Sequence, residues 1–197
     1  VISLVLLLKV KAVKPLERSE APTLKSLIDG LKYATSRKDL MGTYLVDLSA
    51  MFWAMPTALY PFWADQLNAR WALGLLYAAG TIGSILVTLT SGWIKRYHHH
   101  GRAITWAAIG WGISIALAGA TNSLPLIIFF LALAGASDMV SALFRGLIWN
   151  QSIADEYRGR LAGIELLSYS VGPLGGQMRA GSMAAWTNLR TSVISGG

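Results

Sequence analysis

The chain has 197 residues, of which 54% are hydrophobic and 14% are charged, and its formal net charge is +7. A soluble domain of this length carries about 25% charged residues, so the composition excludes an ordinary water-soluble protein, including a soluble binding module. The absence of cysteine excludes a disulfide framework, a thiolate metal site and a cysteine nucleophile. In a soluble protein this positive charge would suggest a nucleic-acid partner. In a membrane protein, however, the position of each charge must be considered before the net charge is interpreted. We therefore expect no nucleic-acid partner.

The amino-terminal part divides into two segments. Residues 1–8 are apolar and have neither an initiator Met nor a charged segment, so we expect the end of a preceding transmembrane helix rather than a signal peptide. Residues 9–39 form a basic linker with eight Lys or Arg residues. Its second half predicts an amphipathic helix, either on the membrane surface or in a solvated linker. Apolar residues recur there at helical steps of three and four: Leu24, Leu27, Ile28, Leu31 and Ala34.

Residues 40–197 contain apolar blocks long enough to cross a bilayer, which takes about 20 residues. Five complete spans are expected, at residues 40–64, 71–94, 103–120, 126–149 and 161–186, with a sixth span beginning near the end of the sequence. Pro56 and Pro61 should kink or end the outer half of the first span. Residues 155–160 are expected to form a polar loop. The sequence thus predicts an all-α membrane bundle, and we expect the chain to be a fragment truncated before its last helix.

The basic residues alternate between the two sides of this arrangement. The loops at 9–39, 95–102 and 155–160 hold 13 Lys or Arg residues, whereas the three opposite turns hold two. The positive-inside rule places the more basic loops in the cytoplasm. The sequence therefore predicts a multi-pass protein whose long basic linker is cytoplasmic.

Five ionisable residues fall inside the predicted spans, where a charge near the bilayer centre costs about 3 kcal/mol: Asp47, Asp138, Arg145, Glu165 and Arg179. Asp138 and Arg145 are seven residues apart, so they share one helix face at a spacing of about 10 Å, and Arg145 can reach back. Such residues either line a water-accessible path for substrate or protons, or only hold helices together. We favour the path for Asp138 and Arg145, the structural role for Glu165 and Arg179, and leave Asp47 open.

Small residues also suggest close helix packing. Gly172 and Gly176 have the four-residue spacing that lets helix backbones approach, and Pro173 permits bending. A moving interface and a static one remain equally compatible with this pattern. Eight tryptophans are present; they could line a cavity for aromatic substrates, although Trp71, Trp149 and Trp186 near span ends fit interfacial anchoring better.

Three adjacent histidines lie in the second basic loop: His98, His99 and His100. Neighbouring residues of a short loop do not readily converge on one ion, and no second cluster of ligands is present, so we expect no metal site. No HExxH, GxSxG, Walker-type or dinucleotide motif occurs. We therefore expect neither an enzyme nor a bound cofactor.

Several short motifs follow one another in a characteristic order: Leu27-x-x-Gly30-Leu31-x-Tyr33, Met55-Pro56 with Leu59-Tyr60-Pro61, Gly74-Leu75-Leu76-Tyr77-Ala78-Ala79 before Gly83, Gly135-Ala136-Ser137-Asp138 with Ala142 and Phe144-Arg145, Arg158-Gly159-Arg160-Leu161, and Gly172-Pro173 with Arg179-Ala180-Gly181. Because of these motifs and their order, the chain resembles the carboxyl-terminal half of a transporter of the major facilitator superfamily, in the branch similar to the bacterial enterobactin exporter. The loop from Gly92 to Arg102 matches the position of the gating motif of that superfamily. It keeps Gly92, Arg96 and Arg102 but lacks the acidic residue.

The resemblance implies a twelve-helix transporter of the bacterial inner membrane, whose missing amino-terminal half supplies six more spans and half of the substrate cavity. It implies proton-coupled export of a small molecule, such as a siderophore, drug or metabolite, by alternating access. Asp138 and Arg145 would then line the cavity, with Asp47 as a further candidate for the substrate or proton pathway. The alternative is a non-transporting membrane scaffold or sensor that retains the fold.

Overall fold

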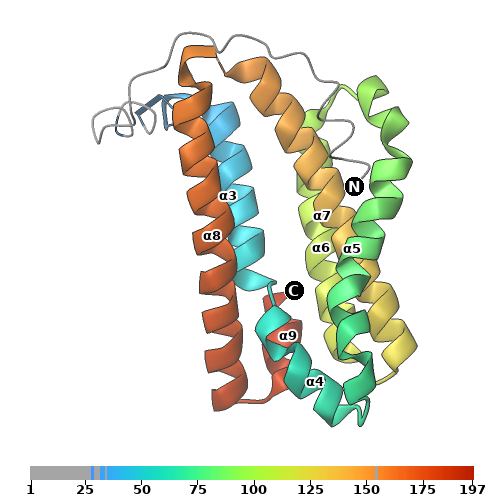
Figure 1. The fold of residues 1–197 in the computed structure, drawn as a ribbon. Coiled ribbons are helices and arrows are strands. Elements are labelled where there is room, and N and C mark those ends of the chain that lie inside the picture. Colours follow the sequence, from blue (N-terminus) through green and yellow to red (C-terminus); the bar gives the residue numbers. More distant parts are fainter. Residues whose placement is uncertain (1–27, 29–31, 34, 154) are drawn as a thin grey trace, which may run out of the picture.

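The computed structural model describes residue 28 and residues 32, 33, 35–153 and 155–197, without the side chains of 155–160 and 163–168. All regular structure in this part of the chain is helical (Figure 1), which confirms the all-α prediction. The α-helices are α3 (Lys38–Trp53), α4 (Tyr60–Gln66), α5 (Leu73–Leu89), α6 (His100–Ala120), α7 (Leu124–Ser152), α8 (Asp155–Trp186) and α9 (Leu189–Gly196). Short 3-10 helices connect them: η1 (Thr57–Leu59), η2 (Arg70–Ala72) and η3 (Ser91–Arg96). The expected helix end at 1–8 and most of the linker at 9–39 lie outside the described residues.

Three of the described helical segments are long and apolar enough to cross a membrane: Arg70–Leu89, His100–Ala120 and Leu124–Ser152. They correspond to the second, third and fourth predicted spans. The fifth predicted span is the longer α8, and the polar loop expected at 155–160 was wrong because α8 already begins at Asp155. Acidic residues in a first helical turn are favourable beside the positive end of the helix dipole, so the charges of this segment do not oppose a helix.

The first predicted span is divided into two helices. The helix α3 ends at Trp53, where the N–H of Ala54 still donates to the carbonyl oxygen of Ala50 at 2.9 Å. Pro56 follows, and a proline disfavours helical geometry in the residue before it. Pro61 lies in the first turn of α4, where its missing N–H has no intrahelical role. The break that the two prolines predicted is therefore confirmed.

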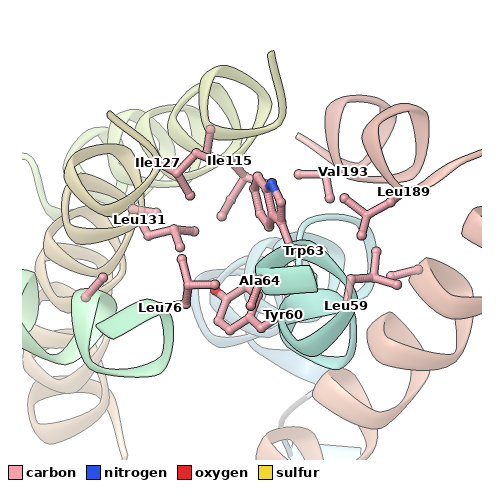
Figure 2. Close-up of a cluster of buried hydrophobic side chains, with 14 of the residues drawn as sticks. Leu59, Tyr60, Trp63, Ala64, Leu76, Ile115, Ile127, Leu131, Leu189 and Val193 are labelled. Atoms are coloured by element: carbon pink, nitrogen blue, oxygen red, sulfur yellow. The ribbon is translucent and has the colours of Figure 1, made fainter. Parts of the chain in front are cut away.

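The helices form two groups joined by the short helices α4 and α9. In one group α5 and α6 pack on α7, and in the other α3 packs along α8 (Figure 1). The side chain of Trp63 on α4 is 4% exposed and lies between Ile115 of α6 and Val193 of α9 (Figure 2). Together these side chains belong to one apolar core that includes residues of both groups.

The helices α5 and α7 meet backbone to backbone. A Cβ atom on Gly83 would collide with the carbonyl oxygen of Ala132, and one on Gly135 would collide with the carbonyl oxygen of Gly80. At the same crossing the hydroxyl of Ser84 donates to the carbonyl oxygen of Gly135 at 3.0 Å. Small residues allow this approach, as is typical of helix pairs in membranes.

The outward faces of α5, α6 and α7 carry large exposed apolar side chains: Leu75, Ile82, Ile85, Leu86, Leu89, Trp106, Ile109, Ile113, Leu117, Leu126, Phe129 and Leu133. Soluble monomers rarely expose contiguous apolar patches above a few hundred Å². A lipid hydrocarbon layer removes this cost, because all backbone groups of a helix are bonded within it. The protein is therefore embedded in a membrane.

The contact between α5 and α7 predicts a specific sensitivity. The substitution Gly83→Ala should lower the free energy of unfolding by about 2 kcal/mol, because the added methyl group forces two backbones apart. The apparent melting temperature in detergent micelles is the measurement. The matched control is Gly74→Ala in the same helix, where a Cβ atom meets nothing within 4 Å. Equal melting temperatures for the two variants would contradict the close packing.

Candidate functional site

The candidate site is centred on Asp138, at the middle of the longest apolar span. The helix α7 runs from Leu124 to Ser152, so Asp138 is fourteen residues from each end. At 1.5 Å per residue this is about 21 Å from either end of the helix. A carboxyl group at this depth is costly unless it faces a partner or water.

Arg145 supplies that partner from the same helix. Its guanidinium Nη2 lies 3.8 Å from the Oδ1 atom of Asp138, across two helical turns. Side chains on a helix incline toward its amino terminus, so the long arginine side chain extends back toward Asp138. The expectation that both residues share a face and that Arg145 can reach back is thus met in the geometry.

Asp47 on α3 completes a cluster of three charges, here named the charge triad: Asp47, Asp138 and Arg145. A carboxylate oxygen of Asp47 forms an ion pair with Nη1 of Arg145. The side chains of Arg145 and Asp47 are 8% and 10% exposed, whereas that of Asp138 is 43% exposed. The triad thus joins α3 to α7, with one buried ion pair and one accessible carboxyl group.

The charges of the triad do not balance. With both carboxyl groups ionised, two negative charges face one positive charge, so its formal charge is −1. The buried pair of Asp47 and Arg145 compensates itself, because a desolvated guanidinium and carboxylate attract strongly. Asp138 is farther from the guanidinium and more exposed, so the excess negative charge is concentrated on its carboxyl group.

Two cavities meet at Asp138. The smaller one has a volume of about 50 Å³ and lies between α3, α6 and α7, with both Asp47 and Asp138 in its wall. The larger one, here named the aromatic cavity, has a volume of about 280 Å³. Residues of η1, α4, α5, α6 and α7 line it, including Tyr60, Tyr77 and Trp111. Trp111 lines both cavities, so the indole and the Asp138 carboxyl group lie at the junction of the two.

The sequence does not predict that these three aromatic residues line one cavity, although Tyr60 and Tyr77 occur in the family motifs and Trp111 is one of the eight tryptophans. Tyr60, Tyr77 and Trp111 occur among many other apolar and aromatic residues, and no spacing relates them because they lie on three helices. The indole N–H of Trp111 donates to the carbonyl oxygen of Ala54 at 3.1 Å. The indole of Trp111 therefore bonds to one of the carbonyl groups that have no helical partner where α3 ends. The helix break at the prolines is the one sequence signal that relates to the position of Trp111.

Arg179 lies apart from the triad. Its guanidinium is 3.4 Å from the carbonyl oxygen of Ser192 on α9 and 5.7 Å from the ring centroid of Trp53 at the end of α3. A guanidinium in this position can join three helices through a hydrogen bond and a cation–π contact. The side chain of Glu165, the other secondary candidate, lies outside the described part of the structure.

Gly172 and Gly176 of α8 face α3. A Cβ atom on Gly176 would collide with the carbonyl oxygen of Met51, and one on Gly172 would lie 3.3 Å from side-chain atoms of Leu48 and Met51. Pro173 lies inside α8 without ending it. The helices α3 and α8 therefore also meet backbone to backbone, at Gly176.

The loop from Gly92 to Arg102 lacks the acidic residue of the gating motif, and aromatic rings connect this loop to α7. The ring of Phe144, which is fully buried next to Arg145, lies 5.8, 5.6 and 5.6 Å from the rings of Trp93, Tyr97 and His100, respectively. The other loop candidates are on the outside. Exposed positions of this loop include the remaining candidates Gly92, Arg96, His98, His99 and Arg102. Within the described residues, no group of three or more His, Cys, Asp or Glu could hold a metal ion.

Several known exporters are similar in sequence to this chain at 26–27% identity. The chain is 26% identical over 175 residues to the multidrug efflux pump Tap of Mycolicibacterium fortuitum, which covers 87% of the chain and 42% of Tap. It is 27% identical over 198 residues to the enterobactin exporter EntS of Escherichia coli O81 (strain ED1a), which covers 99% of the chain and 47% of EntS. EntS of Shigella boydii serotype 18 matches equally well. The resemblance to the major facilitator superfamily is confirmed.

The chain corresponds to the carboxyl-terminal half of the two exporters. It spans a little under half the length of these curated relatives. No protein-family model matches the chain. No solved structure matches it either.

The buried ion pair of the triad predicts a large effect on stability. The substitution Asp47→Asn should destabilise the protein by about 3 kcal/mol, because it removes the carboxylate that compensates a desolvated guanidinium. The apparent melting temperature in detergent is the measurement. The control is Asp65→Asn, which breaks the exposed ion pair with Arg70 and should have no measurable effect. A melting temperature for Asp47→Asn equal to that of the control would disprove the buried pair.

Proposed function

We propose that this chain is the carboxyl-terminal half of a proton-coupled exporter of small molecules in a bacterial inner membrane. The observation that carries the proposal is the charge triad at the middle of a membrane-spanning helix. Ionisable residues at this depth are costly and are usually found where protons, ions or substrates pass. The relatives named as an efflux pump and an exporter support export as the direction.

In the proposed mechanism Asp138 carries the coupling proton. Its side chain is the most exposed of the triad and lines both cavities, so protons can reach it. Asp47 and Arg145 are positioning residues in this scheme, because their buried pair holds α3 against α7 around the carboxyl group. The second half of the substrate cavity belongs to the amino-terminal half of the transporter, and alternating access comes from rocking of the two halves.

The orientation follows from the basic loops. The loop at 95–102 and the start of α8 would lie in the cytoplasm, together with the linker at 9–39. Arg145 is then nearer the cytoplasmic end of α7 than Asp138. No catalytic role is part of this proposal, in which the triad provides binding and protonation.

The test is transport by the full-length protein in everted membrane vesicles energised by respiration. The panel is enterobactin, ethidium and fluorescein, and nigericin collapses the pH gradient. The wild type should accumulate at least one compound in a nigericin-sensitive manner. Asp138→Asn should lose this accumulation at least tenfold while inserting normally, because an amide does not exchange a proton.

The matched control is Asp65→Asn, which removes a carboxylate from the surface and should transport like the wild type. Gradient-driven transport at the wild-type rate by Asp138→Asn would refute the role of Asp138. A correctly inserted wild type that moves none of the three compounds would favour the non-transporting scaffold and count against the proposal.

A further inference from the structure

The aromatic cavity has the size and lining of a small-molecule site. Its volume of about 280 Å³ is close to the lower end of the range for drug-sized pockets, which begins near 300 Å³. Such pockets are mostly apolar and have a few polar groups that orient the ligand. This cavity follows that pattern, because apolar residues of α5, α6 and α7 surround a few hydroxyl groups and one carboxyl group.

The three aromatic rings in its wall are held by contacts at their edges. The rings of Tyr60 and Tyr77 meet edge to face with centroids 5.1 Å apart. The hydroxyl of Tyr77 donates to the carbonyl oxygen of Thr57 at 3.3 Å, and the indole N–H of Trp111 donates to Ala54. The polar atoms of Tyr77 and Trp111 are thus used by the backbone, so these residues contribute aromatic surface to the cavity.

The charge of the lining has one sign. Asp138 is the only charged residue among the described residues that line the aromatic cavity. Arg145 does not line it; its side chain is 8% exposed and its guanidinium is paired with Asp47. An anion in the cavity would therefore meet a carboxyl group and aromatic faces, both of which repel negative charge. A cation would meet a counter-ion and rings that attract it.

We propose that the aromatic cavity binds a bulky, lipophilic organic cation, with the Asp138 carboxylate as its counter-ion and Tyr60, Tyr77 and Trp111 as its aromatic contacts. This inference rests on the proposed function, since it names the class of substrate that the exporter would carry. The rings favour a large cation of low hydration, because a small metal ion would need several oxygen or nitrogen ligands. Among the described residues, no group of three or more His, Cys, Asp or Glu could hold a metal ion.

The charge requirement can be tested with two ions of nearly the same shape. Tetraphenylphosphonium is a cation and tetraphenylborate is an anion, so a comparison of the two isolates the sign of the charge. Equilibrium dialysis with radiolabelled ions and the full-length protein in detergent measures binding without transport. The wild type should bind tetraphenylphosphonium at least tenfold more tightly than tetraphenylborate. Equal affinity for the two ions would overturn the proposal.

Variants then assign the contacts. Asp138→Asn should weaken binding of tetraphenylphosphonium at least tenfold, whereas Asp138→Glu should retain most of it and Asp65→Asn should retain all of it. Tyr77→Leu should weaken binding about fivefold, because a cation–π contact is lost. Tyr77→Phe keeps the ring and should bind like the wild type. Wild-type binding by both Asp138→Asn and Tyr77→Leu would place the ion elsewhere and refute the assignment.

This binding test separates the present inference from the proposed function. Gradient-driven accumulation of fluorescein but not ethidium, together with absent tetraphenylphosphonium binding, would refute the cation site and leave the exporter in place. Binding that depends on Asp138, without gradient-driven accumulation of any compound, would support the cation site and count against the exporter.

Discussion

The arrangement of this bundle depends on the burial of one guanidinium group. Arg145 is 8% exposed in the middle of apolar helices, and such a charge is tolerated only beside a carboxylate. Asp47 provides it from α3, so the requirement for charge compensation fixes how α3 meets α7. The second carboxyl group, Asp138, remains only partly compensated and accessible. The burial of this guanidinium therefore produces both a fixed contact between α3 and α7 and an accessible carboxyl group at Asp138.

Two kinds of packing occur around this ion pair. Glycines bring backbones together at Gly83 and Gly135 between α5 and α7 and at Gly176 between α8 and α3. Beside Asp138 the helices leave two cavities that its side chain lines. The bundle is therefore tightly packed where helices must hold their positions and open beside the accessible carboxyl group. A site for a ligand requires both conditions, because a cavity persists only within rigid walls.

Part of this structure followed from the sequence. The seven-residue spacing of Asp138 and Arg145 was sufficient to place them on one helix face, and the two prolines were sufficient to predict the break in the first span. The pairing of Arg145 with Asp47 was not predictable, because 98 residues separate them and periodicity along one helix carries no information on its neighbour. The set of residues that lines the aromatic cavity was not predictable for the same reason, because these residues lie on different helices. At residues 155–160 the density of charge was taken for a loop, although charged residues also begin helices.

The break between α3 and α4 has a mechanical consequence. An unbroken span would behave as a stiff rod, and any twist at Asp47 would be passed on to Trp63. Here residues 54–59, which include η1, separate the two helices, and the carbonyl oxygen of Ala54 accepts a hydrogen bond from Trp111 in place of one from the helical ladder. A segment without a continuous helical ladder transmits twist less well than a helix does, so the orientation of α3, set by its ion pair with Arg145, is independent of that of α4, whose Trp63 lies in the apolar core.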